Sequence, residues 1–157
     1  MIKDILVVPT ARAQAVGPFA AAFAQTFGAA MRVACPAFDM ITPTYVVPEM
    51  PVEILDNARE SARAEARAQV EGIAKLARER GIDPRTEVIS GTFDACAHEL
   101  QRRARYADLV VLEQPPAEGR EGETLLAEAL LFGSGRPLVF APYIQKAPLG
   151  FDSALVA

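Results

Sequence analysis

Short runs of apolar residues, with no polar alternation inside them, recur along this chain. Such runs are typical of parallel strands that are covered on both faces, whereas a half-exposed strand alternates apolar and polar side chains. The runs are uninterrupted at 5–8, 109–112 and 138–141, and strands are expected at residues 5–8, 30–35, 86–89, 108–112 and 138–141. We expect the second of them to stop at Pro36, because proline has no N–H to donate to a neighbouring strand.

Helical periodicity fills the intervals between these strands. Apolar side chains recur three and four residues apart, which predicts amphipathic helices at residues 13–27, 52–80, 93–103 and 122–132. In the first helix, the regular part is expected to begin at Pro18. The longest helix is expected to bury one stripe from Val52 to Ala77. Strands that alternate with helices predict an α/β fold, an open doubly wound sheet of five parallel strands with the first strand central.

Glycine and threonine residues mark the expected helix ends. Gly28 and Gly81 follow the first two helices, where glycine readily takes up the left-handed conformation of a C-cap. Ser90 and Gly91 are expected to form a turn, and Thr92 is the expected N-cap of the next helix.

Composition and charge narrow the classes of function. The chain has 157 residues, of which 51% are hydrophobic and 23% charged, as is ordinary for a globular domain. A net charge of −4 predicts no nucleic-acid partner, and no apolar run approaches the roughly 20 residues of a membrane span. The amino terminus leads directly into a strand, which does not suggest a signal peptide. Cys35 and Cys96 cannot form a disulfide framework, so we expect a cytoplasmic protein.

Residues suited to catalysis or metal binding are few. His98 is the single histidine, expected at the surface, with Cys96 in the core. Ser90 and Ser134 have no histidine near them in the expected fold, so no hydrolase triad is predicted. The acidic side chains after the fourth strand are expected to face water, with a divalent-ion site as the less favoured interpretation; they are Glu113, Glu118 and Glu121. The sequence therefore predicts neither a catalytic residue nor a metal site.

The connection at residues 38–51 is long and rich in proline and large apolar side chains. Connections of this length are uncommon in compact domains and are often functional. The favoured interpretation is a half-buried flap over the core. A flap that binds a partner, or a lid over a ligand, is the alternative.

Several segments, taken in order, resemble the universal stress protein family, and the resemblance covers the whole chain. They are residues 3–8 as first strand, residues 77–81 at the end of the long helix, residues 107–112, which are similar to the family's Ala-Asp-Leu-Ile-Val-Met, and residues 134–139 before the fifth strand. The resemblance implies a Rossmann-like sheet of the adenine-nucleotide alpha-hydrolase-like type, with strand order 3-2-1-4-5.

The resemblance also implies where a nucleotide would bind. Members that bind ATP carry an Asp after the first strand and a G-x2-G-x9-G-[S/T] motif after the fourth. In this chain Thr10 stands at the Asp position. Gly119 and Gly122 give the G-x2-G pair, but ten residues rather than nine separate Gly122 from Gly133. We expect Gly133 and Ser134 to lie at the carboxyl end of a helix, whose negative partial charge repels phosphate.

These observations lead to a functional prediction with two alternatives. We expect a non-enzymatic binding and assembly module of the stress response, without a cofactor. The first alternative is a domain that binds ATP or AMP in a variant loop. Its candidate binding residues are Thr10, Arg12, Glu113, Gly119 and Gly122. The second is an enzyme of the adenine-nucleotide alpha-hydrolase-like superfamily, although the segment after the first strand lacks that class's Ser/Gly-rich phosphate loop.

The end of the chain looks like the beginning of a second repeat. Residues 151–157 form a strand pattern similar to residues 2–8, so we expect a domain at 1–147 and, at 148–157, a linker with the first strand of a missing repeat. This resembles the amino-terminal half of a tandem universal stress protein. The strand at 138–141 lies at a sheet edge in the expected order. We therefore expect a homodimer that uses this edge and residues 151–157.

Overall fold

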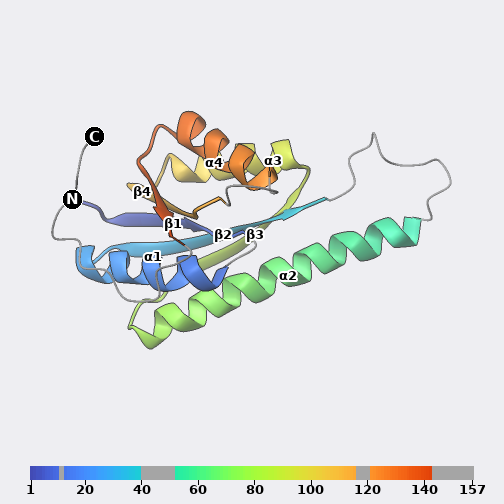
Figure 1. The fold of residues 1–157 in the computed structure, drawn as a ribbon. Helices are drawn as coiled ribbons and strands as arrows, with labels where there is room; N and C mark the ends of the chain where they lie inside the picture. The colour runs from blue at the N-terminus through green and yellow to red at the C-terminus, as the bar shows by residue number, and fades with distance from the viewer. Residues whose placement is uncertain (11–12, 40–51, 116–120, 143–157) are drawn as a thin grey trace.

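A single parallel sheet lies at the centre of the molecule, with helices on both faces (Figure 1). The computed structural model describes residues 1–10, 13–39, 52–115 and 121–142. The elements are β1 (Asp4–Val8), α1 (Ala13–Phe27), β2 (Ala30–Phe38), α2 (Val52–Glu79), β3 (Arg85–Gly91), α3 (Phe93–Ala104), β4 (Leu109–Glu113), α4 (Glu121–Ser134) and β5 (Leu138–Ala141). The strand order is β3-β2-β1-β4-β5, which confirms the predicted fold class.

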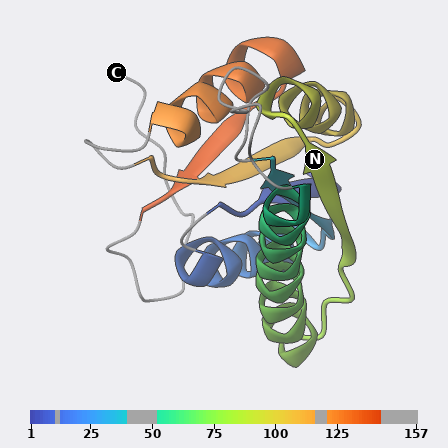
Figure 2. The ribbon, with the colours of Figure 1, turned by 90° about the vertical axis from the view of Figure 1, so that its right-hand side faces the viewer.

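The central strand contributes to two separate cores. Ile5 and Val7 of β1 pack with α1 and α2 on one face of the sheet, whereas Leu6 and Val8 pack with α3 and α4 on the other. Figure 2 shows the two helical layers on either side of the strands. Burial on both faces is the reason why these strands read as continuous apolar runs. In the described residues, no helix is both long and apolar enough to cross a membrane.

The second strand is longer than predicted, because it continues through Pro36 to Phe38. The backbone N–H of Asp39 donates to Gly91 of β3, so the N–H groups of odd-numbered residues face β3. The nitrogen of Pro36 therefore faces β1, and the pairing of β2 with β1 ends before Pro36, at Val33. The missing donor removes no hydrogen bond to β3, and the expectation that Pro36 ends the strand was wrong. The third strand likewise includes Ser90 and Gly91, which we expected in a turn.

Helix α1 begins at Ala13, so Pro18 lies inside it rather than at its start. Gly17 lies close to α2, because a Cβ at this position would lie 3.2 Å from Cγ1 of Ile73. Both helix ends marked by glycine are confirmed: Gly28 and Gly81 have φ angles of 60° and 77°.

Helix α2 is buried over only part of its length. Its buried residues are Ala66, Val70, Ile73, Ala74 and Ala77, and Val52 is 65% exposed. The prediction of a stripe buried from Val52 onward was therefore wrong for the amino-terminal half. Figure 1 gives the reason, since this half of α2 extends past the sheet that covers the other half.

Two predictions fall on residues outside the described ranges. The flap at 38–51 is one of them, apart from its first residues: Phe38 stacks on Phe93 of α3 with ring centroids 5.4 Å apart. The strand at 151–157, with the linker before it, is the other.

Candidate functional site

The carboxyl ends of β1 and β4 lie side by side at the centre of the sheet. Val8 is in register with Leu112, so the residues that follow each strand leave the sheet at the same place. From β1 the chain continues to β2, which lies on one side of β1, whereas β4 and β5 lie on the other side of β1. In open α/β sheets, ligands bind outside the carboxyl ends of the strands at such a switch point.

Thr10 and Glu113, two of the candidate residues, meet at this point. The hydroxyl of Thr10 donates a hydrogen bond of 2.8 Å to Oε2 of Glu113. Glu113 is the last residue of β4 and is only 6% exposed, so the expectation that its carboxyl group faces water was wrong. A buried acidic group is costly unless hydrogen bonds stabilise it, and the Thr10 hydroxyl supplies one.

Two further side chains join this group, and sequence reasoning did not find them. Cys35 of β2 has its Sγ 3.4 Å from Oε1 of Gln69 on α2 and 3.6 Å from the carbonyl oxygen of Pro9. The signal that was available is the place of Cys35 near the end of a strand next to β1. Gln69 gave no signal, because its role depends on how α2 crosses the sheet. We refer to Thr10, Cys35, Gln69 and Glu113 as the β1–β4 site.

The thiol of this site stays protonated at ordinary pH. Burial, followed by the negative charges of Glu113 and Glu65, raises the pKa of Cys35 to about 12. A thiol is nucleophilic and binds metals as the thiolate, so Cys35 is inert in both respects. Cys96 is also buried, its pKa is raised chiefly by burial, and its Sγ lies 3.4 Å from the carbonyl oxygen of Ile89.

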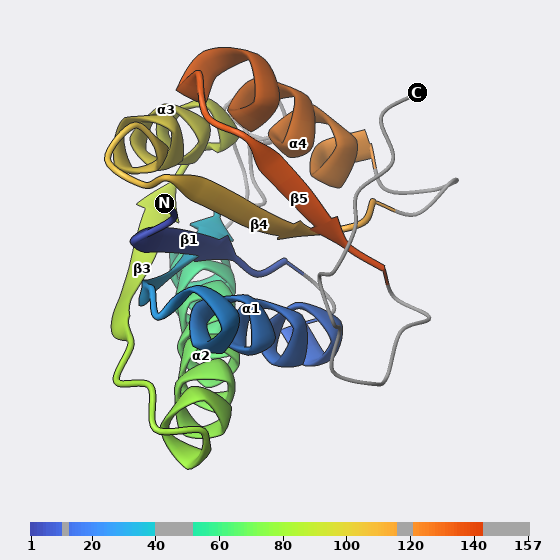
Figure 3. The same cartoon turned by 90° about the vertical axis from the view of Figure 1, so that its left-hand side faces the viewer.

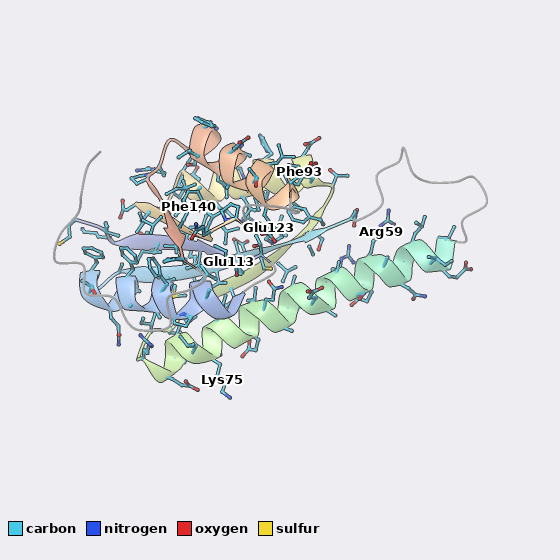
Figure 4. All side chains as sticks on the ribbon, in the orientation of Figure 1. Arg59, Lys75, Phe93, Glu113, Glu123 and Phe140 are labelled. Atoms are coloured by element: carbon cyan, nitrogen blue, oxygen red, sulfur yellow. The ribbon has the colours of Figure 1, made fainter. Side chains whose placement is uncertain are left out.

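Helix α4 begins just after the loop that follows β4. Gly122 lies exposed in its first turn, between the acidic residues Glu121 and Glu123. Figure 4 shows Glu123 and Glu113 from these two elements. The positive end of a helix dipole attracts anions, but two carboxylates in the first turn already lie in its field. Arg12 and Gly119, the remaining candidates, lie outside the described residues.

Gly133 and Ser134 form the last turn of α4, as predicted, and their contacts are structural. The side chain of Gln101 on α3 lies against Gly133 and donates to the carbonyl oxygen of Ala129 at 2.9 Å. A Cβ at position 133 would overlap that side chain. The hydroxyl of Ser134 accepts a hydrogen bond of 3.1 Å from the backbone N–H of Arg136. The glycine therefore allows α3 and α4 to approach closely, and the serine closes the helix.

The other candidates for chemistry lie where the sequence placed them. His98 is exposed on α3, and Cys96 two residues before it is buried. Within the described ranges, no group of three or more His, Cys, Asp or Glu side chains is arranged to hold a metal ion. The β1–β4 site thus offers a carboxyl group, an amide and a hydroxyl, with a protonated thiol beneath them.

Comparison with known proteins finds matches for the fold but none for the sequence. No family model matches the sequence, and no curated protein matches it. Among solved structures, the chain is similar to the universal stress protein UspA from Lactobacillus plantarum, with a TM-score of 0.71 and 18% identity over 89% of this chain and 97% of that one.

Two similar structures contain nucleotides. One is a universal stress protein in complex with cAMP, with a TM-score of 0.58 and 17% identity over 89% of this chain and 97% of that one. The other is the universal stress protein from Archaeoglobus fulgidus in complex with dAMP, with a TM-score of 0.55 and 16% identity over 89% of this chain and 98% of that one. The likeness extends over almost the whole of each structure, and this chain has the fold of the universal stress proteins, as its motifs predicted.

Proposed function

We propose that this chain is a non-enzymatic binding and assembly module of the universal stress protein type, which acts in the cytoplasm during the stress response and does not bind ATP at the β1–β4 site. The observation that carries the proposal is the hydrogen bond between Thr10 and the buried Glu113. In the ATP-binding pattern, an Asp stands at position 10. In this chain the carboxyl group belongs to Glu113 at the end of β4, on the side of the site where the phosphates of a nucleotide would lie.

Charge repulsion supports this exclusion of ATP. Two like charges 4 Å apart repel by about 4 kcal/mol at the effective dielectric constant of a protein surface and by about 1 kcal/mol in bulk water. A triphosphate beside α4 would face Glu113 and also Glu121 and Glu123 in the first turn of that helix.

The state of the thiol supports a non-enzymatic role. Catalysis by a nucleophile needs a group that is activated by a neighbouring base or by a lowered pKa. The Cys35 thiol has the opposite property, because burial raises its pKa to about 12. The single histidine, His98, is exposed on α3, an element that contributes no residue to the β1–β4 site. Two free and buried cysteines also suit a reducing compartment such as the cytoplasm.

A second candidate function is the binding of a nucleotide with one phosphate, such as AMP. The complexes of similar structures with cAMP and dAMP favour it, since those ligands carry a single phosphate group. One phosphate meets less repulsion than three. In this alternative Thr10, Arg12, Glu113, Gly119 and Gly122 would contact the ligand.

A thermal-shift assay on the full chain tests both candidates. The panel is ATP, AMP, cAMP and dAMP at about 1 mM, each with and without Mg²⁺. A ligand at a hundredfold excess over its Kd stabilises the folded state by about 2.7 kcal/mol, which raises Tm by several degrees. We expect no shift with ATP. A shift with AMP or dAMP alone would replace the first candidate with the second, and a shift with ATP would refute the exclusion of ATP.

A gain-of-function pair sharpens the test. The double variant Thr10→Asp with Glu113→Gly installs the Asp of the ATP-binding pattern at position 10 and removes the carboxylate at position 113. We expect it to gain an ATP-dependent shift, whereas the matched pair Thr10→Asn with Glu113→Gln, which also removes the carboxylate at position 113 but has none at position 10, gains none.

A further inference from the structure

Helices α3 and α4 lie side by side on one face of the sheet, and an arginine near the end of each binds the end of the other (Figure 3). Arg105, the C-cap residue of α3, donates from its guanidinium group to the carbonyl oxygen of Gly133 in the last turn of α4, at 3.2 Å. Arg136, which follows α4, donates from Nε and Nη2 to the carbonyl oxygen of Arg105, at 3.1 and 2.6 Å. Both guanidinium groups thus lie at the negative end of a helix dipole and are held in a fixed orientation.

These two guanidinium groups keep donors that no group of the described chain uses. An arginine has five N–H donors in a planar fork. In the contacts above, Arg105 uses one of them and Arg136 uses two. No ion pair joins either arginine to an acidic side chain of the described residues. Because both side chains are exposed, their remaining donors can reach an acceptor outside the molecule.

Two acidic side chains close to Arg105 in the sequence have other partners. Glu99 is paired with Arg102 at 2.7 Å within α3. Asp108 accepts hydrogen bonds from two backbone N–H groups at the start of β1, which lower its pKa more than the charge of Arg136 does. The balance of charge at the ends of α3 and α4 is therefore positive, although the chain as a whole carries a net charge of −4.

Two aromatic rings stand exposed beside these arginines. Phe132 precedes Gly133 and is 81% exposed, and Tyr106 follows Arg105 and is 70% exposed. A single exposed ring is ordinary. Arginine together with aromatic side chains, however, is the composition of the residues that supply most of the binding energy at protein interfaces. We refer to Arg105, Tyr106, Phe132 and Arg136 as the α3–α4 end surface.

We propose that the α3–α4 end surface binds an acidic, extended segment of a partner protein, whose carboxylates pair with the two arginines and whose apolar side chains pack on the two rings. Guanidinium forks match the geometry of carboxylates, and their fixed orientation lowers the entropic cost of binding. A phosphate-rich partner such as RNA fits less well, because the negative ends of two helices lie at this surface and oppose clustered anionic charge. The proposal adds a second surface to the proposed binding role and does not depend on what occupies the β1–β4 site.

Fluorescence anisotropy with a labelled peptide tests this proposal on the full chain. The probe is a short peptide in which two Leu residues are separated and flanked by Glu, and in the reference peptide Gln replaces every Glu. We expect saturable binding of the Glu peptide at low salt, about tenfold or more tighter than that of the Gln peptide. The affinity should fall as the salt concentration rises, because salt screens the exposed charges.

Two double variants examine the rings and the charges separately. Tyr106→Ser with Phe132→Ser removes the rings and keeps the charges. Because both rings are mostly exposed, Tm should stay close to that of the wild type, whereas the affinity for the Glu peptide should fall about tenfold or more. Arg105→Gln with Arg136→Gln removes the charges but keeps side-chain N–H donors near the helix ends, and it should weaken binding by a similar factor.

The matched control for lost charge is Arg63→Gln with Lys75→Gln. Both positions are exposed on α2, which packs on the opposite face of the sheet, so we expect this control to bind the Glu peptide as the wild type does. Circular dichroism melts verify that each variant is folded. A wild type that does not bind the peptide, an unchanged affinity without the two rings, or an equal loss in the control would overturn the proposal. Tighter binding of single-stranded RNA than of the peptide would overturn the choice of partner. All of these outcomes leave the ATP assay at the β1–β4 site unaffected.

Discussion

Replacing Thr10 with Asp should destabilise the protein by charge repulsion, although it installs the residue of the ATP-binding pattern. The hydroxyl oxygen of Thr10 lies 2.8 Å from Oε2 of Glu113, and Glu113 is buried. A carboxylate at position 10 would therefore stand within about 4 Å of another carboxylate. The expected repulsion lies between about 1 kcal/mol, the value in water, and about 4 kcal/mol at an effective dielectric constant of 20.

The matched control is Thr10→Asn, which has the size of Asp, no charge, and an N–H that can donate to Glu113. The difference between Thr10→Asp and Thr10→Asn in the free energy of unfolding isolates the charge. Urea denaturation at pH 8 measures this difference, and we expect about 1 to 4 kcal/mol, with the Asp variant less stable.

The difference in the free energy of unfolding between Thr10→Asp and Thr10→Asn should decrease as the pH falls. In the folded Asp variant the two carboxyl groups hold a proton to a higher pH than isolated Asp and Glu, whose pKa values are about 4. The stability of the variant is thus retained at low pH and lost as pH rises through the folded-state value. The gap to Thr10→Asn should narrow from pH 8 to pH 5. Equal stability of the two variants at pH 8, with no change at pH 5, would refute the contact between position 10 and Glu113.

Three other predictions concern groups around the site and the helices. Burial raises the pKa of Cys35 from 9.0 to about 12, so the free energy of unfolding should fall by about 1.4 kcal/mol for each pH unit above pH 9. In urea titrations at alkaline pH, Cys35→Ala should reduce this dependence of stability on pH. An unchanged dependence would contradict the burial of the thiol. Gly133→Ala should lower Tm, because the new Cβ displaces the side chain of Gln101. In a Gln101→Ala background the same substitution should raise Tm, because only the higher helix propensity of alanine acts there. A change in Tm of the same sign in both backgrounds would show that the two residues do not touch. Thr92→Ala should lower the free energy of unfolding by about 1 kcal/mol in chemical denaturation, because the Thr92 hydroxyl accepts a hydrogen bond from the backbone N–H of Ala95 at the start of α3. A loss near zero would show that this N-cap does not stabilise the protein.

The sheet could be predicted because its signal is local. The strands β1, β4 and β5 each carry their own apolar run, and glycines such as Gly28 and Gly81 mark helix ends by their backbone requirement. Boundaries that depend on neighbours were missed. Pro36 is accommodated because its nitrogen faces away from β3, and the sequence of β2 alone does not reveal that orientation.

The burial of α2 shows the same limit. The apolar stripe has the same periodicity in both halves, but its fully buried residues begin at Ala66. Periodicity indicates which side of a helix is apolar. Whether another element reaches that side depends on the length of the sheet, which is a tertiary property.

The candidate site could be predicted only in part. Thr10 and Glu113 follow strands that the order 3-2-1-4-5 makes neighbours, so their approach follows from topology. The contribution of Gln69 depends on where a long helix crosses the sheet, and that of Cys35 depends on its contact with Gln69. The structural role of Gly133 was predictable from its place at a helix end, whereas its contact with Gln101 was not.

The exclusion of ATP from the β1–β4 site is tested most directly by isothermal titration calorimetry of the full chain with ATP and Mg²⁺. With the buried carboxyl group of Glu113 hydrogen-bonded to Thr10, we expect no saturable heat up to about 1 mM ATP. The Thr10→Asp, Glu113→Gly variant, titrated in parallel, should show saturable binding. A saturable isotherm for the wild type with a Kd below about 100 μM, abolished by Thr10→Ala, would contradict the account.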